Sequence, residues 1–308
     1  MIAPRRCRHP AAACALAFPL LLAACVAPGA PGGRAAAPAP AAPPPIIAPP
    51  AVEAPAPAQL RLDGAARQGG LLHGLAPAGT TALTLDGVPV AFDSEGNFII
   101  AFDRDAGPVA TLIATLRNAP SRTRRIAVAP GDWRIENVNA SITGSASSAE
   151  FQQRRAGELA RIAAARARGE TSDGWRQRFI WPVKARISGV FGSQRIYRGT
   201  PGSYHSGLDL AGGAGTTYLA PADGVVILAA DEPFTLEGKL LMIDHGMGLN
   251  SAFLHNSQLL VKEGDVVKQG QPIGVIGATG RVTGPHLHWS MKWRDARIDP
   301  LLLLPNDP

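Results

Sequence analysis

Short apolar runs separated by turn residues recur over residues 59–130. Two of them, Thr81–Leu85 and Val88–Phe92, flank Asp86-Gly87, a pair that favours the tight turn of a β-hairpin. Pro89 has no backbone N–H to donate, so its strand is predicted to lie at a sheet edge. The pattern therefore predicts a small N-terminal β-domain. Its further predicted strands are 98–102, 109–116 and 126–128.

A helical period follows at Glu150–Arg168, inside a predicted helical connector of residues 131–178. The predicted buried stripe comprises Ala156, Leu159 and Ala163, with Phe151 and Ile162 at its edge. Gly169 suits the C-terminal cap. We interpret the helix's many arginines as a solvated face, partly balanced by two glutamates.

Residues 179–304 are again strand-rich and punctuated by glycine, so the chain is predicted to be mainly β. This region holds five of the seven histidines, which are His205, His245, His255, His286 and His288. His73, by contrast, is predicted to be a plain surface residue. The 34 Gly and 28 Pro show no period, which excludes a collagen-like or coiled-coil chain.

The first 25 residues are typical of a secretory leader, because basic residues precede a short apolar stretch over 11–24. The stretch ends in Leu22-Ala-Ala-Cys25, which resembles the lipobox of bacterial lipoproteins. That resemblance implies a lipid anchor on Cys25; an ordinary signal peptide is the alternative. All 3 cysteines lie within this leader, so the exported chain is predicted to fold without internal disulfides.

Residues 26–58 form a predicted linker, since positions 28–57 contain 11 Pro and 11 Ala. Such a composition favours an extended spacer rather than a packed core. Removing the leader removes three arginines and no acid, so the net charge falls from +6 to about +3. No nucleic-acid-binding motif is recognisable, and we predict no nucleic-acid partner. A mildly basic protein suits an anionic cell-wall polymer.

Candidate chemistry lies in the histidine-rich region. In His205-Ser-Gly-Leu-Asp209, Gly207 permits a bend that brings the two end side chains to one ion. In His286-Leu-His288, both imidazoles share one face of a strand. Two imidazoles and a carboxylate are a common ligand set for catalytic zinc, which lowers the pKa of bound water to about 7. The remaining histidines, including His255, could act as acid, base or oxyanion partner.

Taken in order, these segments resemble the lysostaphin/LytM-type zinc metallopeptidases, over about residues 180–300. Supporting segments are Ser188-Gly-Val-Phe-Gly192, Ala220-Pro-Ala-Asp-Gly-Val225, the run from Val261 to Gly274, and Gly277-Ala-Thr-Gly280. The resemblance implies an antiparallel β-sheet domain of the duplicated-hybrid-motif type. It also implies His205, Asp209 and His288 as Zn²⁺ ligands, with His255 and His286 as the catalytic pair.

Two details qualify this resemblance. The family usually has Leu-Ser after the histidine at position 255, whereas Asn256-Ser257 stand here, which puts the packing of His255 in question. His245 matches a family position that is often histidine without being a ligand, and we interpret it as structural. Arg195 and Tyr204 are predicted to border the groove.

The resemblance implies hydrolysis of peptide cross-links in peptidoglycan, with a D-alanyl–diaminopimelate bridge favoured over pentaglycine. It further suggests that the N-terminal region covers the groove, in which case deleting residues 26–175 raises activity. A periplasmic enzyme anchored at the outer membrane is predicted, because Val26 is not the aspartate that retains enteric lipoproteins at the inner membrane. Whether a protein regulator acts on it is left open.

Two alternatives compete with this interpretation. One is a non-catalytic wall-binding scaffold or activator of other wall hydrolases, although all five functional positions are filled here. The other is a lipoyl- or biotinyl-type carrier module, suggested by Gly264–Gly274. Its candidate Lys239 lacks the Met-Lys-Met context of such carriers.

Overall fold

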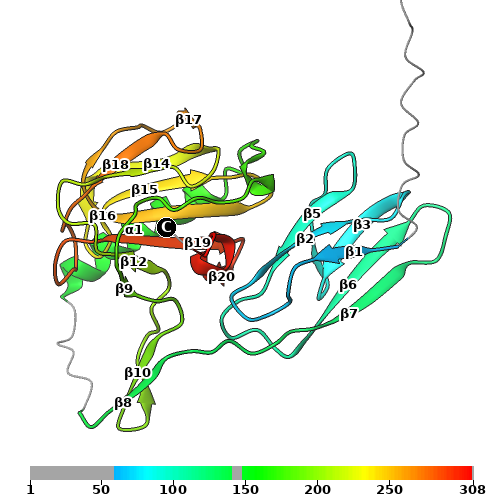
Figure 1. Cartoon of the computed structure of the whole chain (residues 1–308), viewed down its shortest axis with the longest axis horizontal. Helices are drawn as coiled ribbons and strands as arrows, with labels where there is room; N and C mark the ends of the chain where they lie inside the picture. The colour runs from blue at the N-terminus through cyan, green and yellow to red at the C-terminus, as the bar shows by residue number, and fades with distance from the viewer. Residues whose placement is uncertain (1–58, 141–147, 307–308) are drawn as a thin grey trace, which may run out of the picture. The chain divides into compact units, whose positions relative to one another are not determined.

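The computed structural model describes residues 59–140 and 148–306, in which strands predominate (Figure 1). The predicted leader, the lipobox at Cys25 and the whole of the predicted linker lie outside these residues. Within the described residues, none of the helices combines the length and the apolar composition needed to cross a membrane.

The N-terminal region contains two antiparallel sheets, ordered β1-β2-β5 and β4-β3-β6-β7. The predicted hairpin is confirmed, because Asp86 and Gly87 connect β3 to β4 with φ values of 50° and 83°. Pro89 lies in the edge strand β4, as predicted. The strands are β1 (Arg61–Asp63), β2 (Leu71–Leu75), β3 (Thr80–Leu85), β4 (Val88–Pro89), β5 (Asn97–Ala101), β6 (Val109–Leu116) and β7 (Arg122–Ala127).

A further strand, β8 (Ile135–Val138), lies in the segment predicted to be a helical connector. It pairs in parallel with β10 (Gln194–Tyr197), which pairs in turn with β11 (Thr200–Pro201). The sequence pattern did not reveal β8, because its side chains are mostly exposed and lack apolar alternation.

Helix α1 (Ala149–Arg166) begins at Ser148, whose Oγ accepts a hydrogen bond from the Phe151 amide at 3.1 Å. The predicted apolar stripe is wrong: its five members comprise four exposed residues, and only Ile162 is buried. The face that meets the sheet instead comprises Glu158, Ile162 and Ala165.

Polar contacts explain this rotation of α1. The Glu158 carboxylate accepts hydrogen bonds from the Thr235 amide at 2.7 Å and the Thr235 hydroxyl at 2.6 Å. Arg155 donates two hydrogen bonds to Glu237, at 2.5 and 2.7 Å. These long-range partners decide which face is buried, and they also show that not all the helix arginines are solvated.

The C-terminal region is built on a ten-stranded antiparallel sheet, so the predicted mainly β fold is confirmed. Its main path runs β17-β14-β15-β16-β19-β12-β9, with β13, β18 and β20 attached beside it. The strands are β9 (Ile187–Gly189), β12 (Leu208–Leu210), β13 (Thr217–Leu219), β14 (Gly224–Phe234), β15 (Gly238–Asp244), β16 (Leu249–Leu259), β17 (Val266–Val267), β18 (Pro272–Ile276), β19 (Leu287–Trp293) and β20 (Ala296–Ile298). Two short 3₁₀ helices are Gly174–Arg176 and Pro300–Leu303.

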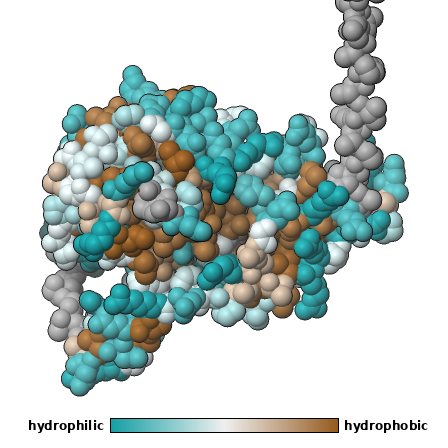
Figure 2. Space-filling view, in the orientation of Figure 1, coloured by the Kyte–Doolittle hydropathy of each residue, from teal (hydrophilic) through white to brown (hydrophobic). Residues whose placement is uncertain are grey.

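Apolar side chains pack on both faces of this sheet. On one face Phe253 stacks on Trp289, with ring centroids 6.2 Å apart. On the other, Ile162 and Ala165 of α1 complete a second cluster with residues of β14, β15 and β16. Because Ile162 and Ala165 belong to this cluster, helix α1 is part of the packing of the C-terminal sheet. On the molecular face in Figure 2, apolar and hydrophilic residues are interspersed over the sheet region.

Candidate active site

Strand pairing places two of the predicted metal ligands side by side. Asp209 of β12 lies directly opposite His288 of β19 in the antiparallel register. His205 precedes β12 in a loop that is held by two backbone hydrogen bonds, from the His205 amide to Ser193 and from the Gly192 amide to His205, each 2.8 Å long. The loop and the two strands thus bring all three side chains to one point.

The donor atoms of this trio suit a metal ion. His205 Nε2 lies 3.0 Å from Asp209 Oδ1 and 3.1 Å from His288 Nδ1, and the last two atoms are 2.8 Å apart. Ligand atoms around tetrahedral zinc are spaced by about 3.3 Å, given bond lengths near 2.0 Å. Two imidazoles and a carboxylate at this spacing fit zinc with little rearrangement.

Two glycines allow this close approach. A Cβ added at Gly207 would lie 2.6 Å from His288 Nε2, and one at Gly189 would lie 2.4 Å from Asp209 Oδ2. Both distances are too short for any side chain. Gly207 was predicted to permit a bend, but it is also needed because any side chain there would collide with the ligand His288. Gly189 lies in the predicted family segment 188–192, but the sequence did not reveal that it lies against Asp209.

His255 reaches the site through an unusual backbone conformation. In a regular β16 it would share a face with Phe253, which is fully buried in the core. Instead His255 has φ 66°, and the pairing of β16 with β18 shifts between Asn256 and Gln258. Its ring centroid lies 5.1 Å from that of His286 and 6.2 Å from that of His288. The positive φ thus directs the His255 ring to the site, whereas strand alternation alone would direct it into the apolar core.

Backbone carbonyls fix the tautomers of three histidines. Nδ1 of His205 lies 3.0 Å from the Val190 oxygen, Nδ1 of His255 2.9 Å from the Thr279 oxygen, and Nδ1 of His286 2.9 Å from the Gly284 oxygen. A carbonyl can only accept, so each Nδ1 carries a hydrogen, and Nε2 is an acceptor whenever the ring is neutral and a second donor when the ring is charged. The Nε2 atoms of His205 and His286 both approach Asp209 Oδ1.

The charges of the cluster are uneven. Burial disfavours the ionised form of Asp209, but hydrogen bonds from His205, His286 and His288 outweigh it and hold the Asp209 pKa well below its usual range. Burial lowers the pKa of His255, and the Thr279 carbonyl only partly opposes it. A hydrogen bond to Asp209 raises the pKa of His286. His255 is therefore biased toward the neutral form and His286 toward the charged one.

Asn256, which stands where the resembled family usually has leucine, is accommodated by hydrogen bonds. Asn256 is fully buried, and its Oδ1 accepts a hydrogen bond from the Tyr218 hydroxyl at 2.7 Å. Its Nδ2 donates to the carbonyl oxygens of Lys239 and Phe253, each at 2.8 Å. The side chain beside His255 is therefore polar but completely bonded.

The other two histidines of the described residues lie apart from this cluster. His245 is fully buried, with Nδ1 2.8 Å from the Asp223 carbonyl and Nε2 2.8 Å from Ser251 Oγ, which supports the structural interpretation. The surface prediction for His73 is wrong, because His73 is partly buried and stacks on Trp175 at 6.3 Å.

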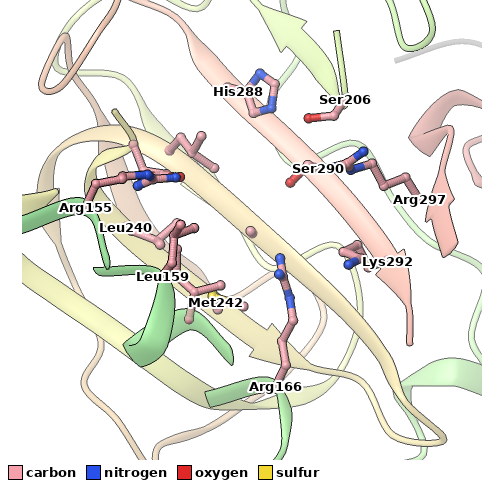
Figure 3. A pocket seen from close by; sticks show the side chains of 14 residues that line it. Arg155, Leu159, Arg166, Ser206, Leu240, Met242, His288, Ser290, Lys292 and Arg297 are labelled. Carbon is pink, nitrogen blue, oxygen red and sulfur yellow. The ribbon is translucent and has the colours of Figure 1, made fainter. Parts of the chain in front are cut away.

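Cavities flank the cluster on two sides. One, of about 740 Å³, lies beside His205 and Asp209 and is lined by Arg195 and Tyr204, as predicted. The other, of about 200 Å³, adjoins His288 and lies between α1 and β19 (Figure 3). Its basic side chains come from separate segments, and no local motif in the sequence signals them.

Residues 203–300 match Peptidase family M23, so the C-terminal region carries an M23 peptidase domain. Peptidoglycan DD-endopeptidase ShyA of Vibrio cholerae is 40% identical over 126 residues, which is 41% of this chain and 29% of ShyA. Murein hydrolase activator NlpD of Escherichia coli is 32% identical over 131 residues, or 42% of this chain and 31% of NlpD. The similarity thus spans less than a third of either relative.

A crystal structure of a Pseudomonas aeruginosa protein assigned to peptidase M23 superposes with a TM-score of 0.59 at 29% sequence identity. The match covers 78% of this chain and 95% of that one, so it includes much more than the M23 segment. The similarity in fold therefore extends into the region before the M23 domain.

Proposed function

We propose that this protein is a zinc-dependent endopeptidase that hydrolyses peptide cross-links in peptidoglycan. The observation that carries the proposal is the convergence of His205, Asp209 and His288, with His255 and His286 beside them. The names of the relatives support a cell-wall substrate, and ShyA supports a DD-endopeptidase. We assign the D-alanyl–diaminopimelate bridge as the bond that is cut.

Each residue then has a distinct task. Zinc held by His205, Asp209 and His288 would supply a Lewis acid that polarises the scissile carbonyl and lowers the pKa of water. His255, biased toward the neutral form, offers Nε2 to accept a proton from the attacking water. His286, whose ring lies 5.1 Å from that of His255, would donate a hydrogen bond to the developing oxyanion.

We further propose that the protein is exported and acts in the periplasm. The leader in residues 1–25 and the wall substrate support export, and the lipobox supports a lipid on Cys25. The Pro/Ala-rich linker would then hold the folded region away from the outer membrane.

The test is digestion of purified peptidoglycan by residues 59–308, with the fragments identified by mass spectrometry. This chain keeps α1, because a deletion through residue 175 would uncover the apolar cluster that Ile162 and Ala165 complete. We expect dimeric muropeptides to become monomers. His286→Ala should lower the rate by about 10²- to 10⁴-fold with zinc retained, whereas His288→Ala should lose both zinc and activity.

An activator of other wall hydrolases is the second candidate, which the name of NlpD favours. A zinc-loaded wild-type protein that leaves the wall intact, yet accelerates a separate wall hydrolase, would replace the proposed function with this one. A carrier role finds no support, because the Lys239 ammonium is paired with Asp231 at 2.6 Å and is mostly covered.

A further inference from the structure

The pocket between α1 and β19 begins at the proposed metal site. His288 and Ser206 lie at one end of it, and Ser290 and Lys292 follow along β19 (Figure 3). Positions 288, 290 and 292 share one face of the strand, because side chains alternate. The pocket is thus a direct extension of the site along β19.

Three cations line this pocket beyond His288. They are Arg166 of α1, Lys292 of β19 and Arg297 of β20 (Figure 3). A fourth, Arg155, also lines the pocket, but its guanidinium is already bound by Glu237 and Glu158. The other three come from different elements, so only the tertiary fold brings them together.

These three cations have few acidic partners among the described residues. Arg166 Nε donates to the neutral Asn250 amide at 3.3 Å, and Arg297 Nη1 donates to the Tyr204 hydroxyl at 3.0 Å. Lys292 Nζ lies 3.8 Å from Asp295, whose carboxylate is fully exposed. Asp103 is also near, but its carboxylate accepts from the Arg297 backbone amide. The pocket therefore has an excess of positive charge.

Burial adds to this imbalance. Burial lowers the pKa of Arg166, and the neighbouring Arg297 lowers it further. Burial likewise lowers the pKa of Lys292, with Arg166 and Arg297 contributing. Like charges held together in a partly covered pocket are destabilising unless an anion joins them. The arrangement is thus prepared for an anionic ligand.

We propose that Arg166, Lys292 and Arg297 bind a free carboxylate of the substrate's peptide, and so select stems that carry one. This inference rests on the proposed function, and it adds a feature of the substrate, a free carboxylate, that the metal site does not contact. Guanidinium and ammonium groups are the usual partners of carboxylates in proteins.

The distance along β19 between His288 and Lys292 indicates how far this carboxylate lies from the bond that is cut. Lys292 is four strand residues from His288, or about 13 Å along β19. The carboxylate is therefore about two to four residues of extended peptide from the bond that is cut, given the reach of the cationic side chains. Apolar Leu159, Leu240 and Met242 line the opposite side of the pocket and suit small side chains such as that of alanine.

The test uses the zinc-loaded mature chain and a cross-linked stem-peptide dimer. Arg166→Gln, Lys292→Met and Arg297→Gln should each lower kcat/KM by about 10- to 100-fold, mainly through KM. Matched controls are Arg168→Gln, two residues past the end of α1 and paired with Glu170, and the exposed Lys262→Met. Both controls should stay within about twofold of wild type.

Amidated dimers identify the carboxylate. One dimer is amidated only at its C-terminal carboxylates, and another only at its side-chain carboxylates. We expect the kcat/KM of wild type to be about 10- to 100-fold lower on one of these amidated dimers than on the unmodified dimer. For the pocket variants, kcat/KM should fall little further when the same amidated dimer replaces the unmodified one. Equal cleavage of all three dimers by wild type would overturn the inference and leave the proposed function intact. Cleavage of none would instead contradict the proposed function.

A binding measurement separates recognition from folding and turnover. His286→Ala protein, titrated calorimetrically with a stem peptide and with its amide, should bind the free carboxylate about 10- to 100-fold more tightly. Arg166→Lys, which keeps the charge, should retain most of this preference, whereas Arg166→Gln should lose it. Equal binding of peptide and amide by the His286→Ala protein would contradict the inference.

Discussion

The N-terminal and C-terminal β regions both consist largely of antiparallel strands, but they bury different side chains. In β5 the buried residues are Phe98, Ile99, Ile100 and Ala101, all of them apolar. Seven of the buried polar residues among the described ones fall in the C-terminal sheet region instead. They are Asp244, His245, Asn250, Ser251, His255, Asn256 and His288.

The difference teaches how to separate structural from functional polar burial. His245 and Asn256 have their hydrogen-bonding atoms paired within the protein, so their burial needs no further partner. His205, Asp209 and His288 instead direct acceptor atoms at one another, which is stable only with a proton or a cation between them. Convergence of unpaired acceptor atoms marks the site, whereas burial alone does not.

The largest expected effect on stability lies in the apolar region. Phe98→Ala should reduce the free energy of unfolding by about 3 to 5 kcal/mol. The Phe98 ring fills the space over Gly74, where an added Cβ would lie 2.2 Å from it. Denaturant unfolding measures the loss, and exposed Phe151→Ala serves as the control. The zinc content of the folded Phe98→Ala protein at low temperature should equal that of wild type. If the substitution lowered the zinc content as well as the stability, the N-terminal region would not be separable from the site.

His245 should make stability depend on pH. Burial lowers its pKa from 6.5 to about 4 in the folded protein. Between about pH 6.5 and 4, His245 binds a proton in the unfolded chain but not in the folded protein. Its contribution to the free energy of unfolding is therefore complete above about pH 6.5 and is lost as the pH decreases toward 4. The total loss is about 3 kcal/mol, of which about 2 kcal/mol has occurred by pH 5.

The measurement is unfolding of the metal-free protein at pH 7 and pH 5, compared with His245→Gln. A glutamine retains a donor and an acceptor but does not titrate, so its stability should change with pH by about 2 kcal/mol less than that of wild type. Identical pH dependence in the two proteins would show that His245 is not the group responsible.

The smallest effect sharpens the comparison within β16. Asn256→Leu should cost about 2 kcal/mol, because it leaves the buried Tyr218 hydroxyl and two backbone carbonyls without their partner. Adding Tyr218→Phe should recover part of that loss, so the double variant is more stable than the sum of the single changes predicts. Strict additivity of the two changes would mean that the pair is not coupled.

Local chemistry made several features predictable from the sequence. The Asp86-Gly87 turn and the edge position of Pro89 depend only on backbone conformations and hydrogen-bond donors of a few residues. His205, Asp209, His286 and His288 could be singled out because they stand in two short motifs of fixed spacing, whereas His255 was singled out by the family resemblance. The structure brings all five to one place.

Only the tertiary structure decided the rest. The buried face of α1 follows from Thr235 and Glu237, which lie far away in sequence. The direction of His255 follows from a register shift in β16, where simple alternation would bury its ring in the core. The cationic pocket requires α1, β19 and β20 to meet. Burial and charge are properties of neighbours in space, so a pattern along the chain determines them only where those neighbours are also close in sequence.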